Sequence, residues 1–289
     1  MKPELAKQTI IADFPEFKGS SFQVLHNRHS IVLEASKNNE SFIFKFALTP
    51  QNYDILKEIE LLKHFTDKLP VNIPQVCYIG KMFPYFGYPK IQSNQLTEDT
   101  FLKLPQAVQD HILEQISTFL QSIHNQKNKP QPHLIMHDPS SQYSANILEF
   151  CKQNPHEADL QRFSERIVEA FQIWEAKQIS TKRFVYNDLH FANLLIDEHY
   201  NLTVLDFGFC AEGYPHRDFH QFHKYQAPLL SHLLERYTQK TGREVDIKGI
   251  ELTSKIDQLN YYFTLHKNSK TEYLEAVKAP ILKWMKEGH

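Results

Sequence analysis

Two polar stretches in the second half of the chain carry residue types suited to phosphate chemistry. The first contains Asp188 and, five residues later, Asn193, and the second contains Asp206 followed by Phe207 and Gly208. A carboxylate can accept the proton of a hydroxyl group, and carboxylate and carboxamide oxygens are hard ligands of the kind that Mg²⁺ prefers beside phosphate oxygens. The spacing therefore predicts phosphoryl transfer to a hydroxyl, with Asp188 as base and Asn193 and Asp206 as Mg²⁺ ligands.

The combination of these residues is more informative than any one of them. An isolated aspartate or asparagine is most often a turn or cap residue, whereas all five at this spacing arise by chance in well under about one chain in a hundred. The context agrees, because apolar Phe184 and Val185 lead into the first stretch. Turn residues 197–201 then separate two strand-like runs, 194–196 and 202–205. The second carboxylate is therefore expected at the end of a hairpin.

The first third of the chain is patterned as strands around a single helix. Short runs rich in β-branched and apolar residues predict five strands, at residues 22–25, 30–35, 41–46, 76–79 and 86–91. Apolar residues at helical spacing predict a helix over residues 53–65, with Pro50 just before it. In the third strand, Lys45 alternates with Phe44 and Phe46, so we expect it on the opposite face of the sheet.

After Gln92 the pattern becomes helical. Apolar residues at helical spacing predict one helix between Pro105 and Pro130, a second around residues 163–174, and more helix from Pro228 to the end. The sequence therefore predicts an α+β fold of two lobes. The first lobe is an antiparallel sheet with one helix that binds nucleotide, and the mainly helical second lobe holds the catalytic loop, the metal site and the substrate pocket. The two lobes are residues 1–91 and 92–289.

Composition and charge narrow the class of protein. Of the 289 residues, 41% are hydrophobic and 23% are charged, which is ordinary for a folded soluble protein. The formal net charge of -2 gives no basic excess, so we expect neither nucleic acid nor an anionic membrane as main partner. No apolar run approaches the roughly 18 residues needed to cross a bilayer. Residues 1–13 lack the apolar segment of a secretory signal, and three widely spaced cysteines suit a reducing compartment. We expect a cytoplasmic monomer.

The stretches 185–195 and 204–218 resemble the aminoglycoside phosphotransferase family. The catalytic loop of that family is similar to H-x-D-x-x-x-x-N and is followed by D-F-G-x-x-x-x-G-x-P-x-x-D. This chain matches the pattern at Asp188, Asn193, Asp206, Phe207, Gly208, Gly213, Pro215 and Asp218. It departs at Tyr186, where the family often has a histidine that positions the loop and is not the base. The resemblance implies a bilobal protein-kinase-like fold and transfer of the γ-phosphate of a nucleoside triphosphate to a small molecule.

A weaker resemblance extends over most of the chain and points to one branch of the family. Phe86–Ile91, with Leu96 and Thr97 after it and a helix ending at His124, looks like the branch that phosphorylates aminoglycosides at the 2″ hydroxyl. The acceptor implied is an aminoglycoside-type antibiotic, and the biological role implied is antibiotic resistance.

Lys45 and Glu58 are the expected partners of the triphosphate in the first lobe. A lysine on the third strand can reach the α- and β-phosphates if an acid on the next helix holds it. The run Leu56–Leu62 resembles the corresponding helix of the family and aligns its glutamate at Glu58, with Glu60 as the alternative. A solvated lysine and a solvated helix face would be the ordinary interpretation of either residue alone. The downstream motif favours the functional interpretation.

The resemblance also implies which segments surround the nucleotide: the loop at residues 26–30 and the connection between the lobes, here called the joint, at residues 88–91. No glycine lies between Gly19 and Gly80, so the G-x-G-x-x-G of protein kinases is absent. Residues 26–30 are expected to cover the phosphates with backbone amides and the Ser30 hydroxyl. At the joint, Ile91 would offer its N–H and Pro89 its carbonyl to the purine. Tyr88 falls at the back of the base pocket, where a bulky residue resembles members that favour GTP over ATP.

Acidic side chains of the second lobe are candidates for binding a cationic acceptor, and we name Glu212, Asp218, Glu235 and Asp257 without ranking them. Asp218 has an alternative role, which is to brace the catalytic loop. A zinc site formed by His216, His220 and neighbouring histidines is a weaker hypothesis, because their spacing crosses the boundary expected at Pro215.

Several functions remain open beside an aminoglycoside kinase. The family likeness is compatible with a kinase of an amino alcohol, a choline-like compound or a sugar, because one fold serves many acceptors. A protein kinase and a non-catalytic nucleotide-binding module rank lower. The chain lacks the glycine-rich loop expected of a protein kinase. A module without turnover has no chemical need to keep Lys45, Asp188, Asn193 and Asp206 together.

Overall fold

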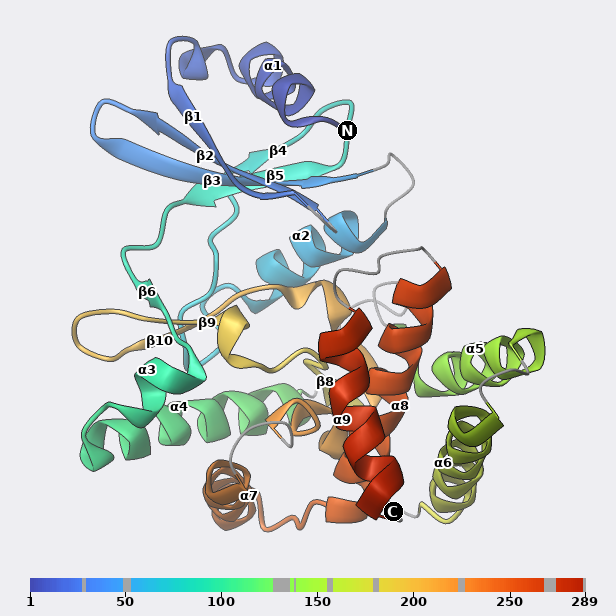
Figure 1. Ribbon diagram of the computed structural model, residues 1–289. Helices are drawn as coiled ribbons and strands as arrows, with labels where there is room; N and C mark the ends of the chain where they lie inside the picture. The colour runs from blue at the N-terminus through green and yellow to red at the C-terminus, as the bar shows by residue number, and fades with distance from the viewer. Residues whose placement is uncertain are drawn as a thin grey trace. The chain divides into compact units, whose positions relative to one another are not determined.

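The computed structural model describes most of the chain as two compact units. The residues described are 1–27, 30–48, 53–126, 136–137, 139–154, 158–178, 182–222, 227–267 and 274–287. Unit 1 is Met1–Ile135 with His190–Cys210, and unit 2 is Met136–Leu189 with Ala211–His289. The lobe boundary expected at residue 91 lies inside unit 1 and stays a prediction. The division into a strand-rich N-terminal part and a mainly helical C-terminal part is confirmed (Figure 1).

Unit 1 begins with an antiparallel sheet of five strands. In spatial order these are β1 (Ser21–Asn27), β2 (Ser30–Lys37), β3 (Glu40–Ala47), β5 (Tyr85–Pro89) and β4 (Tyr78–Ile79). All neighbouring pairs are antiparallel, and the five strands expected from the sequence are present with slightly different ends. β5 ends one residue before Lys90, whose N–H donates to the carbonyl of Ser41 at 2.7 Å.

One face of this sheet is a hydrophobic core covered by helix α1 (Pro3–Asp13). Phe44 and Phe46 are fully buried in it, as their alternation with Lys45 predicts, and Ala6 and Ile10 of α1 pack with them. Figure 1 shows α1 lying against β1 and β2. No helix is predicted here from the sequence. Only two of its residues are buried, so its apolar stripe is too short to produce a helical period.

Helix α2 (Tyr53–Phe65) has the bounds that the sequence predicts. Its apolar residues Ile55, Ile59, Leu61, Leu62 and Phe65 are buried, whereas Leu56 is exposed. The helix contacts β3 and β5, and also the turn at residues 207–209. It therefore links the sheet to the second polar stretch of the sequence.

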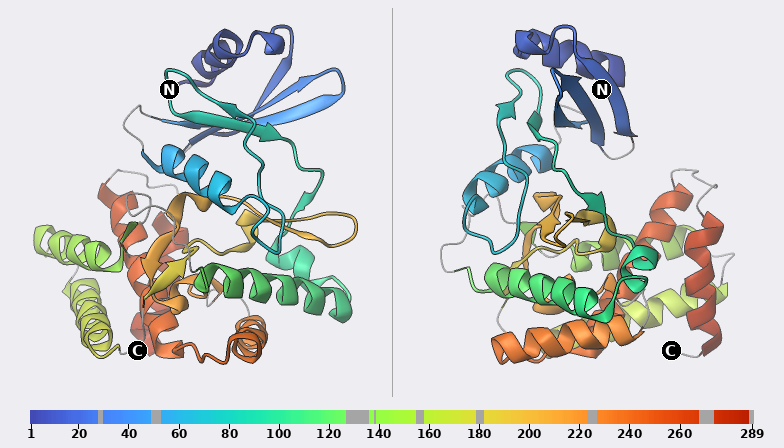
Figure 2. Two further views of the ribbon diagram at one scale, coloured as in Figure 1. Left: turned by 180° about the vertical axis from the view of Figure 1, so that it is seen from behind. Right: turned by 90° about the vertical axis from the view of Figure 1, so that its left-hand side faces the viewer.

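The rest of unit 1 is built around the predicted hairpin of β9 (Leu194–Ile196) and β10 (Leu202–Val204). Strand β6 (Asn94–Gln95) pairs with β9, and helices α3 (Glu98–Leu102) and α4 (Gln106–His124) follow it. The side chain of Gln115 on α4 fixes the hairpin turn. It donates to the Tyr200 carbonyl at 2.8 Å and accepts from the Leu202 N–H at 2.8 Å. The views in Figures 1 and 2 both show α4 running alongside this hairpin.

Unit 2 is a helical assembly with one small sheet. Its described helices are α5 (Ser140–Gln153), α6 (Ala158–Ala176), α7 (Ala227–Thr241), α8 (Ile247–Lys267) and α9 (Leu274–Glu287). The sheet pairs β11 (Ala211–Gly213) with β7 (Met136–His137) and β8 (Arg183–Val185). Helix α8 is buried over most of its length, against α5, α6 and α9. A Cβ at Gly249 would lie 2.3 Å from the Trp174 ring, so only glycine permits this close packing of α6 on α8.

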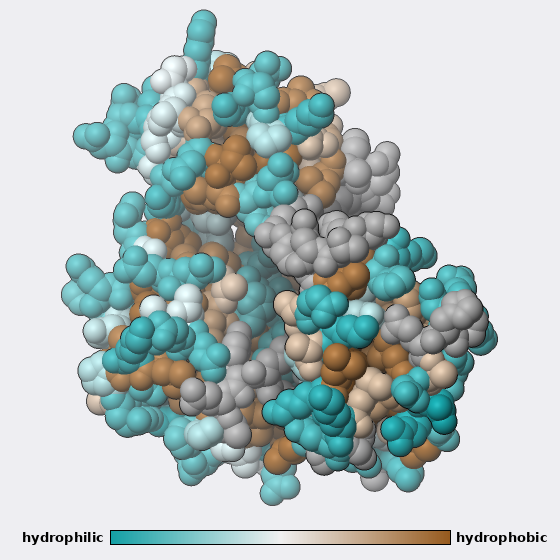
Figure 3. Space-filling view, viewed as in Figure 1, coloured by the Kyte–Doolittle hydropathy of each residue, from teal (hydrophilic) through white to brown (hydrophobic). Residues whose placement is uncertain are grey.

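Polar side chains cover most of the face of the molecule shown in Figure 3, and apolar ones form small separate patches. Large exposed apolar residues, such as Met82, Ile173 and Ile247, come from different elements. Among the helices that the structure describes, none combines the length and apolar character required to cross a membrane.

Candidate active site

Three charged side chains meet in unit 1, one from each of three elements. Lys45 on β3 places its Nζ 2.7 Å from Oε2 of Glu58 on α2 and 3.0 Å from Oδ1 of Asp206, which follows β10. The side chain of Glu58 is 3% exposed and that of Lys45 is 15% exposed, while Asp206 keeps 31% of its side-chain surface open. The structure thus joins two of the sequence-predicted triphosphate partners to one predicted metal ligand. Glu60, the alternative partner, is exposed and pairs with Lys63.

Burial and charge act against each other in this cluster. Burial is the largest influence on Lys45 and lowers its pKa, but the carboxylates of Glu58 and Asp206 together outweigh burial and hold the pKa above its ordinary value. Burial raises the pKa of Glu58 to about 7, because Lys45 offsets the loss of hydration only in part and Asp206 adds a second negative charge. The lysine is therefore a permanent cation, and the charge of the glutamate depends on pH.

This raised pKa predicts a pH-dependent cost in stability. The folded Glu58 carboxyl keeps its proton from about pH 4.5 up to about 7, where the unfolded one has lost it, so the protein loses stability as pH rises through this window. In nucleotide-free protein, the unfolding free energy of wild type minus that of Glu58→Gln should fall by on the order of 3 kcal/mol between pH 4 and 8. Urea unfolding at several pH values measures this difference. A difference that stays flat or rises with pH contradicts the assignment.

The hairpin in unit 1 brings the two predicted metal ligands next to each other along the backbone. Asn193 ends the 3-10 turn Phe191–Asn193, and its carbonyl accepts from the N–H of Leu205 at 2.9 Å. Leu205 immediately precedes Asp206, which has a left-handed backbone with φ of 56°. A carboxylate beside a carboxamide is a hard oxygen donor set, so these residues fit Mg²⁺.

Phe207 holds the turn that carries Asp206. Its ring packs 5.9 Å from that of Phe65 on α2 and 6.3 Å from that of Phe119 on α4, measured between ring centroids. The next residue is Gly208, at which a Cβ would lie 3.4 Å from Oδ1 of Asp206. An apolar anchor next to the predicted metal ligand explains how a turn of three residues keeps one orientation.

The face of the sheet that carries Lys45 is apolar around it. The strand register places Val32 and Phe86 directly opposite Lys45 on the neighbouring strands, and it pairs Ile43 with Tyr88. The rings of Phe86 and Tyr88 stack with centroids 5.9 Å apart. An apolar surface next to a buried cation suits a purine base attached to phosphates.

The other predicted nucleotide-binding residues lie at the edges of this face. Ser30 is the first residue of β2, while Arg28 and His29 of the expected phosphate loop lie outside the described residues. Pro89 ends β5, and Ile91 follows it at a half-buried position. Their roles toward a nucleotide stay predictions.

Unit 2 contains the loop that the sequence predicts to be catalytic, called the catalytic loop below, and its Asp188 is half-buried. The two residues before it are hydrogen-bonded to Asp218, whose carboxylate is fully buried. Asp218 accepts from the N–H of Tyr186 at 3.1 Å and from the N–H of Asn187. These contacts agree with the bracing role of Asp218. They occupy both of its carboxylate oxygens, which a cationic substrate would need.

The other candidate acids of unit 2 differ in how available their carboxylates are. Asp257 on α8 lies 3.1 Å from Arg217 and 2.7 Å from His220, so it too is engaged within the unit. Glu235 on α7 is exposed and accepts from Gln239 at 3.2 Å. Glu212 lies on β11 at a half-buried position. In the described part of the chain, no three histidine, cysteine or acidic side chains are grouped as a metal site.

Comparison with protein families identifies the chain. The model of the phosphotransferase enzyme family, APH, matches residues 25–249, from the end of β1 to the start of α8, which include every residue of the candidate site above except Asp257. The chain belongs to this family. It is an enzyme, a small-molecule phosphotransferase that uses a nucleoside triphosphate, and the family resemblance seen in the sequence is confirmed.

Solved structures share the fold of this phosphotransferase at low sequence identity. The GDP and kanamycin complex of APH(2″)-IIIa is 20% identical with a TM-score of 0.82, and the match covers 99% of both chains. The GDP complex of wild-type aminoglycoside 2′-phosphotransferase-IIIa is 19% identical with a TM-score of 0.84 over 100% of both. Choline kinase LicA from Streptococcus pneumoniae is 12% identical with a TM-score of 0.74 over 98% of both. No curated protein sequence matches the chain.

Sequence reasoning missed one residue that shapes the metal-binding turn of the phosphotransferase. The ammonium of Lys57, adjacent to Glu58 on α2, donates to the carbonyls of Gly208 at 2.8 Å and Cys210 at 2.6 Å. The side chain is buried, and burial lowers the pKa of Lys57. A lysine in an amphipathic helix is normally solvated, so nothing in the sequence distinguishes this one. Its contacts tie α2 to the C-terminal end of the Asp-Phe-Gly turn.

Proposed function

We propose that this enzyme transfers the γ-phosphate of GTP or ATP to a hydroxyl of an aminoglycoside, with Mg²⁺ as cofactor. The observation that carries the proposal is the contact of Lys45 with both Glu58 and Asp206, because this arrangement of a strand lysine, a helix glutamate and a turn aspartate serves to bind a metal-bound triphosphate. The family membership fixes the reaction class. The 2″-phosphotransferase resemblance supplies the acceptor class and, with it, a role in antibiotic resistance.

Each residue has one proposed role. Lys45, held by Glu58, binds phosphate oxygens of the nucleotide, and its charge is maintained by the two carboxylates beside it. Asn193 and Asp206 would hold Mg²⁺, which when bound neutralises charge on the phosphate oxygens. Asp188 accepts a hydrogen bond from the acceptor hydroxyl and orients its oxygen toward the γ-phosphorus. It takes the hydroxyl proton as the new P–O bond forms, while the bond from the γ-phosphorus to the β,γ-bridging oxygen breaks and the nucleoside diphosphate leaves.

The purine is proposed to lie on the apolar face beside Lys45. Ile91 N–H and the Pro89 carbonyl are suited to its hydrogen-bonding edge, and Tyr88 bounds the pocket at the strand end. The Ser30 hydroxyl is proposed to reach the phosphates. We expect a monomer to suffice for activity, because every proposed role is filled by one chain.

A choline-like or amino-alcohol acceptor is the second candidate, and a specific observation favours it. Of the four acids proposed for a polycationic acceptor, Asp218 and Asp257 are engaged by groups of unit 2 itself. Glu235 accepts a hydrogen bond from Gln239. An acceptor with one positive charge needs fewer carboxylates than an aminoglycoside does.

A panel of acceptors tests the proposal. Purified protein with Mg²⁺ and γ-labelled ATP or GTP is incubated with kanamycin, gentamicin, choline, ethanolamine and glucose, and labelled products are separated. We expect label on the aminoglycosides. Label on choline or ethanolamine alone would replace the acceptor class and keep the mechanism. Absence of Mg²⁺-dependent loss of nucleotide with every acceptor, and with water, would overturn the mechanism.

Nucleotide choice gives a separate prediction at Tyr88. Replacing it with alanine should enlarge the proposed base pocket, where the Tyr88 ring lies beside Ile43 and Phe86. The kcat/KM for ATP relative to that for GTP should rise by about 10-fold. Steady-state kinetics with both nucleotides measures the ratio. The exposed Met82→Ala, outside the Lys45 face, serves as control and should leave the ratio unchanged. An unchanged ratio in Tyr88→Ala would remove Tyr88 from the base pocket.

A further inference from the structure

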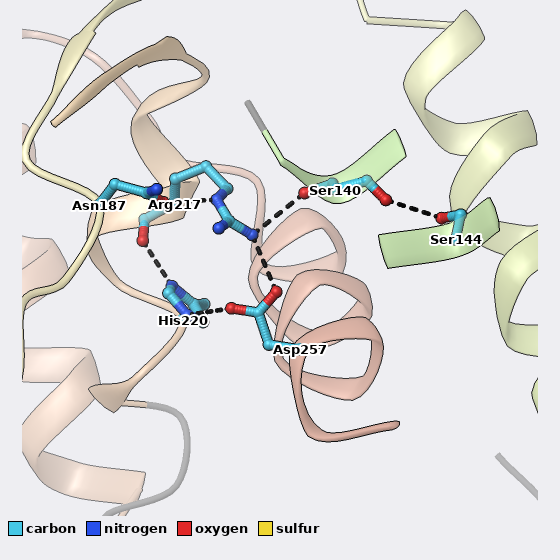
Figure 4. A network of polar contacts seen from close by, with 6 residues as sticks. All are labelled: Ser140, Ser144, Asn187, Arg217, His220 and Asp257. Atoms are coloured by element: carbon cyan, nitrogen blue, oxygen red, sulfur yellow. Dashed lines mark hydrogen bonds and ion pairs between the residues drawn. The ribbon is translucent and has the colours of Figure 1, made fainter. Parts of the chain in front are cut away.

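Arg217 is a buried cation in unit 2 whose contacts have no place in the chemistry above. Its side chain is 2% exposed. The Nε donates to Oδ1 of Asn187 at 2.8 Å, and Nη1 donates to the Ser140 hydroxyl at 3.0 Å and to Oδ1 of Asp257 at 3.1 Å. Figure 4 shows the guanidinium between these three groups, which come from the catalytic loop, α5 and α8. A buried guanidinium with this many directed bonds has a single orientation.

Asn187, the target of Nε, is the residue directly before Asp188, and its backbone is unusual. Its φ is 70°, in the left-handed region that side chains other than glycine seldom adopt, although asparagine does so more readily than most. Two consecutive residues form hydrogen bonds with Asn187. Asp218 accepts from its backbone N–H, and Arg217 donates to its side-chain oxygen. The left-handed turn that directs the chain into Asp188 is thereby fixed on both main chain and side chain.

The far side of Arg217 is held by Asp257 and His220. His220 is buried, and its Nδ1 lies 2.5 Å from the Arg217 carbonyl while its Nε2 lies 2.7 Å from Oδ2 of Asp257. Burial would raise the pKa of Asp257, but Arg217 and His220 outweigh it and hold that pKa below its ordinary value. The Asp257 carboxylate thus lies against both Arg217 and His220.

The outer edge of this network continues into α5. The Ser140 hydroxyl accepts from Arg217, and the Ser140 carbonyl accepts from the Ser144 hydroxyl at 2.9 Å. Ser144 does not contact Arg217 or the catalytic loop in the contacts of the described residues, so it provides a matched position at which one buried hydroxyl can be removed.

We propose that Arg217 is a positioning residue for phosphoryl transfer: it holds Asn187 in the left-handed conformation that aims Asp188 at the acceptor hydroxyl, and Asp257 and His220 hold Arg217. The proposal rests on the proposed function in one respect, which is the role of Asp188 as base. It also assigns Asp257 to the support of the catalytic loop. Misplacement of a reacting group by about 1 Å can reduce the rate about 100-fold, so a residue that touches no substrate can limit kcat.

The test compares kcat and KM for Mg²⁺-dependent ATP hydrolysis, with water as acceptor, across a set of variants of the full chain. Arg217→Met should lower kcat about 10- to 100-fold and change the KM for ATP less than about 3-fold. Asn187→Ala should lower kcat by a similar factor, whereas Asn187→Gly should lose less because glycine adopts positive φ freely. In the Asn187→Gly background, adding Arg217→Met should lower kcat less than about 3-fold. The hydrogen bond from Arg217 to the Asn187 side chain is already absent there. Ser144→Ala should keep wild-type kcat.

The outcomes separate positioning from a merely structural role. Equal losses for Arg217→Met in both backgrounds, or equal activity of Asn187→Ala and Asn187→Gly, would overturn the proposal. If Arg217→Met does not fold, the two Asn187 variants, which leave Arg217 and Asp257 in place, decide the question alone. If wild type consumes neither ATP nor GTP with water or with any acceptor of the panel, the proposed function fails. Crystal structures of wild type and Asn187→Ala then decide the positioning: a φ at residue 187 that leaves the positive range in the variant supports it, and an unchanged φ overturns it.

Discussion

Replacement of Asp188 by asparagine should lower kcat for phosphoryl transfer by about 1,000-fold and change the affinity for magnesium-bound nucleotide by less than about 2-fold. Asparagine keeps the shape of the side chain and can still accept a hydrogen bond, but it cannot take the proton of the hydroxyl. Asp188 belongs to unit 2, whereas Lys45 and the two proposed metal ligands, Asn193 and Asp206, belong to unit 1. Loss of turnover with binding kept is therefore the signature expected of a base that does not itself hold the nucleotide.

Rapid-quench kinetics and titration calorimetry on the same preparation measure the two quantities. Asp159→Asn is the matched control, because it makes the same chemical change at an exposed position of unit 2, where the carboxylate pairs only with Arg162 of its own helix in the described contacts. It should behave as wild type. Ordinary turnover by Asp188→Asn, or a nucleotide affinity that falls in parallel with turnover, would defeat the assignment of Asp188 as base.

Asp206→Asn should have the opposite signature and weaken nucleotide binding itself. The substitution removes the charge of one proposed metal ligand and one of the two carboxylates that face Lys45, at 3.0 Å. Affinity for ATP in the presence of Mg²⁺ should drop about 10- to 100-fold, toward the value measured with a chelator, because the carboxamide is a weaker ligand. Turnover should fall with it.

Titration calorimetry with and without Mg²⁺ separates the metal effect from the effect on Lys45. Asp99→Asn provides the control in unit 1, since its carboxylate is exposed and pairs with Lys103 within α3 and its C-cap. If the affinity of Asp206→Asn for ATP differs between titrations with and without Mg²⁺ as much as that of wild type does, Asp206 is not a metal ligand.

The parts of the fold that repeat a short-range pattern could be predicted from the sequence. Phe44, Lys45 and Phe46 alternate with period two, and the structure places the phenylalanines in the core and the lysine against α2. The bounds of α2 follow from a helical apolar stripe with clear ends. The hairpin of β9 and β10 follows from two apolar runs around a polar turn. In each case the local sequence and the tertiary packing require the same residues.

The contacts that orient the site could not be predicted in this way. Lys57 is separated from Gly208 by 151 residues, and Arg217 from Asn187 by 30, so both depend on how distant segments pack. From sequence alone, a lysine or an arginine in a helix or turn is expected to be exposed to solvent. Lys57 and Arg217 are instead buried, because backbone carbonyls or side-chain acceptors surround them. Asp257 illustrates the same limit. We named it as a substrate acid because of its charge, and its partners became visible only when α8 was placed beside residues 215–218.

A crystal structure of the full chain with Mg²⁺ and a non-hydrolysable GTP analogue decides whether these side chains form one site. We predict one metal ion bound by the side-chain oxygens of Asn193 and Asp206, phosphate oxygens bound by Lys45, and the Asp188 carboxylate facing the γ-phosphate. Nucleotide bound elsewhere, or a metal ion held by other side chains while Asp188 points away from the phosphates, would contradict it.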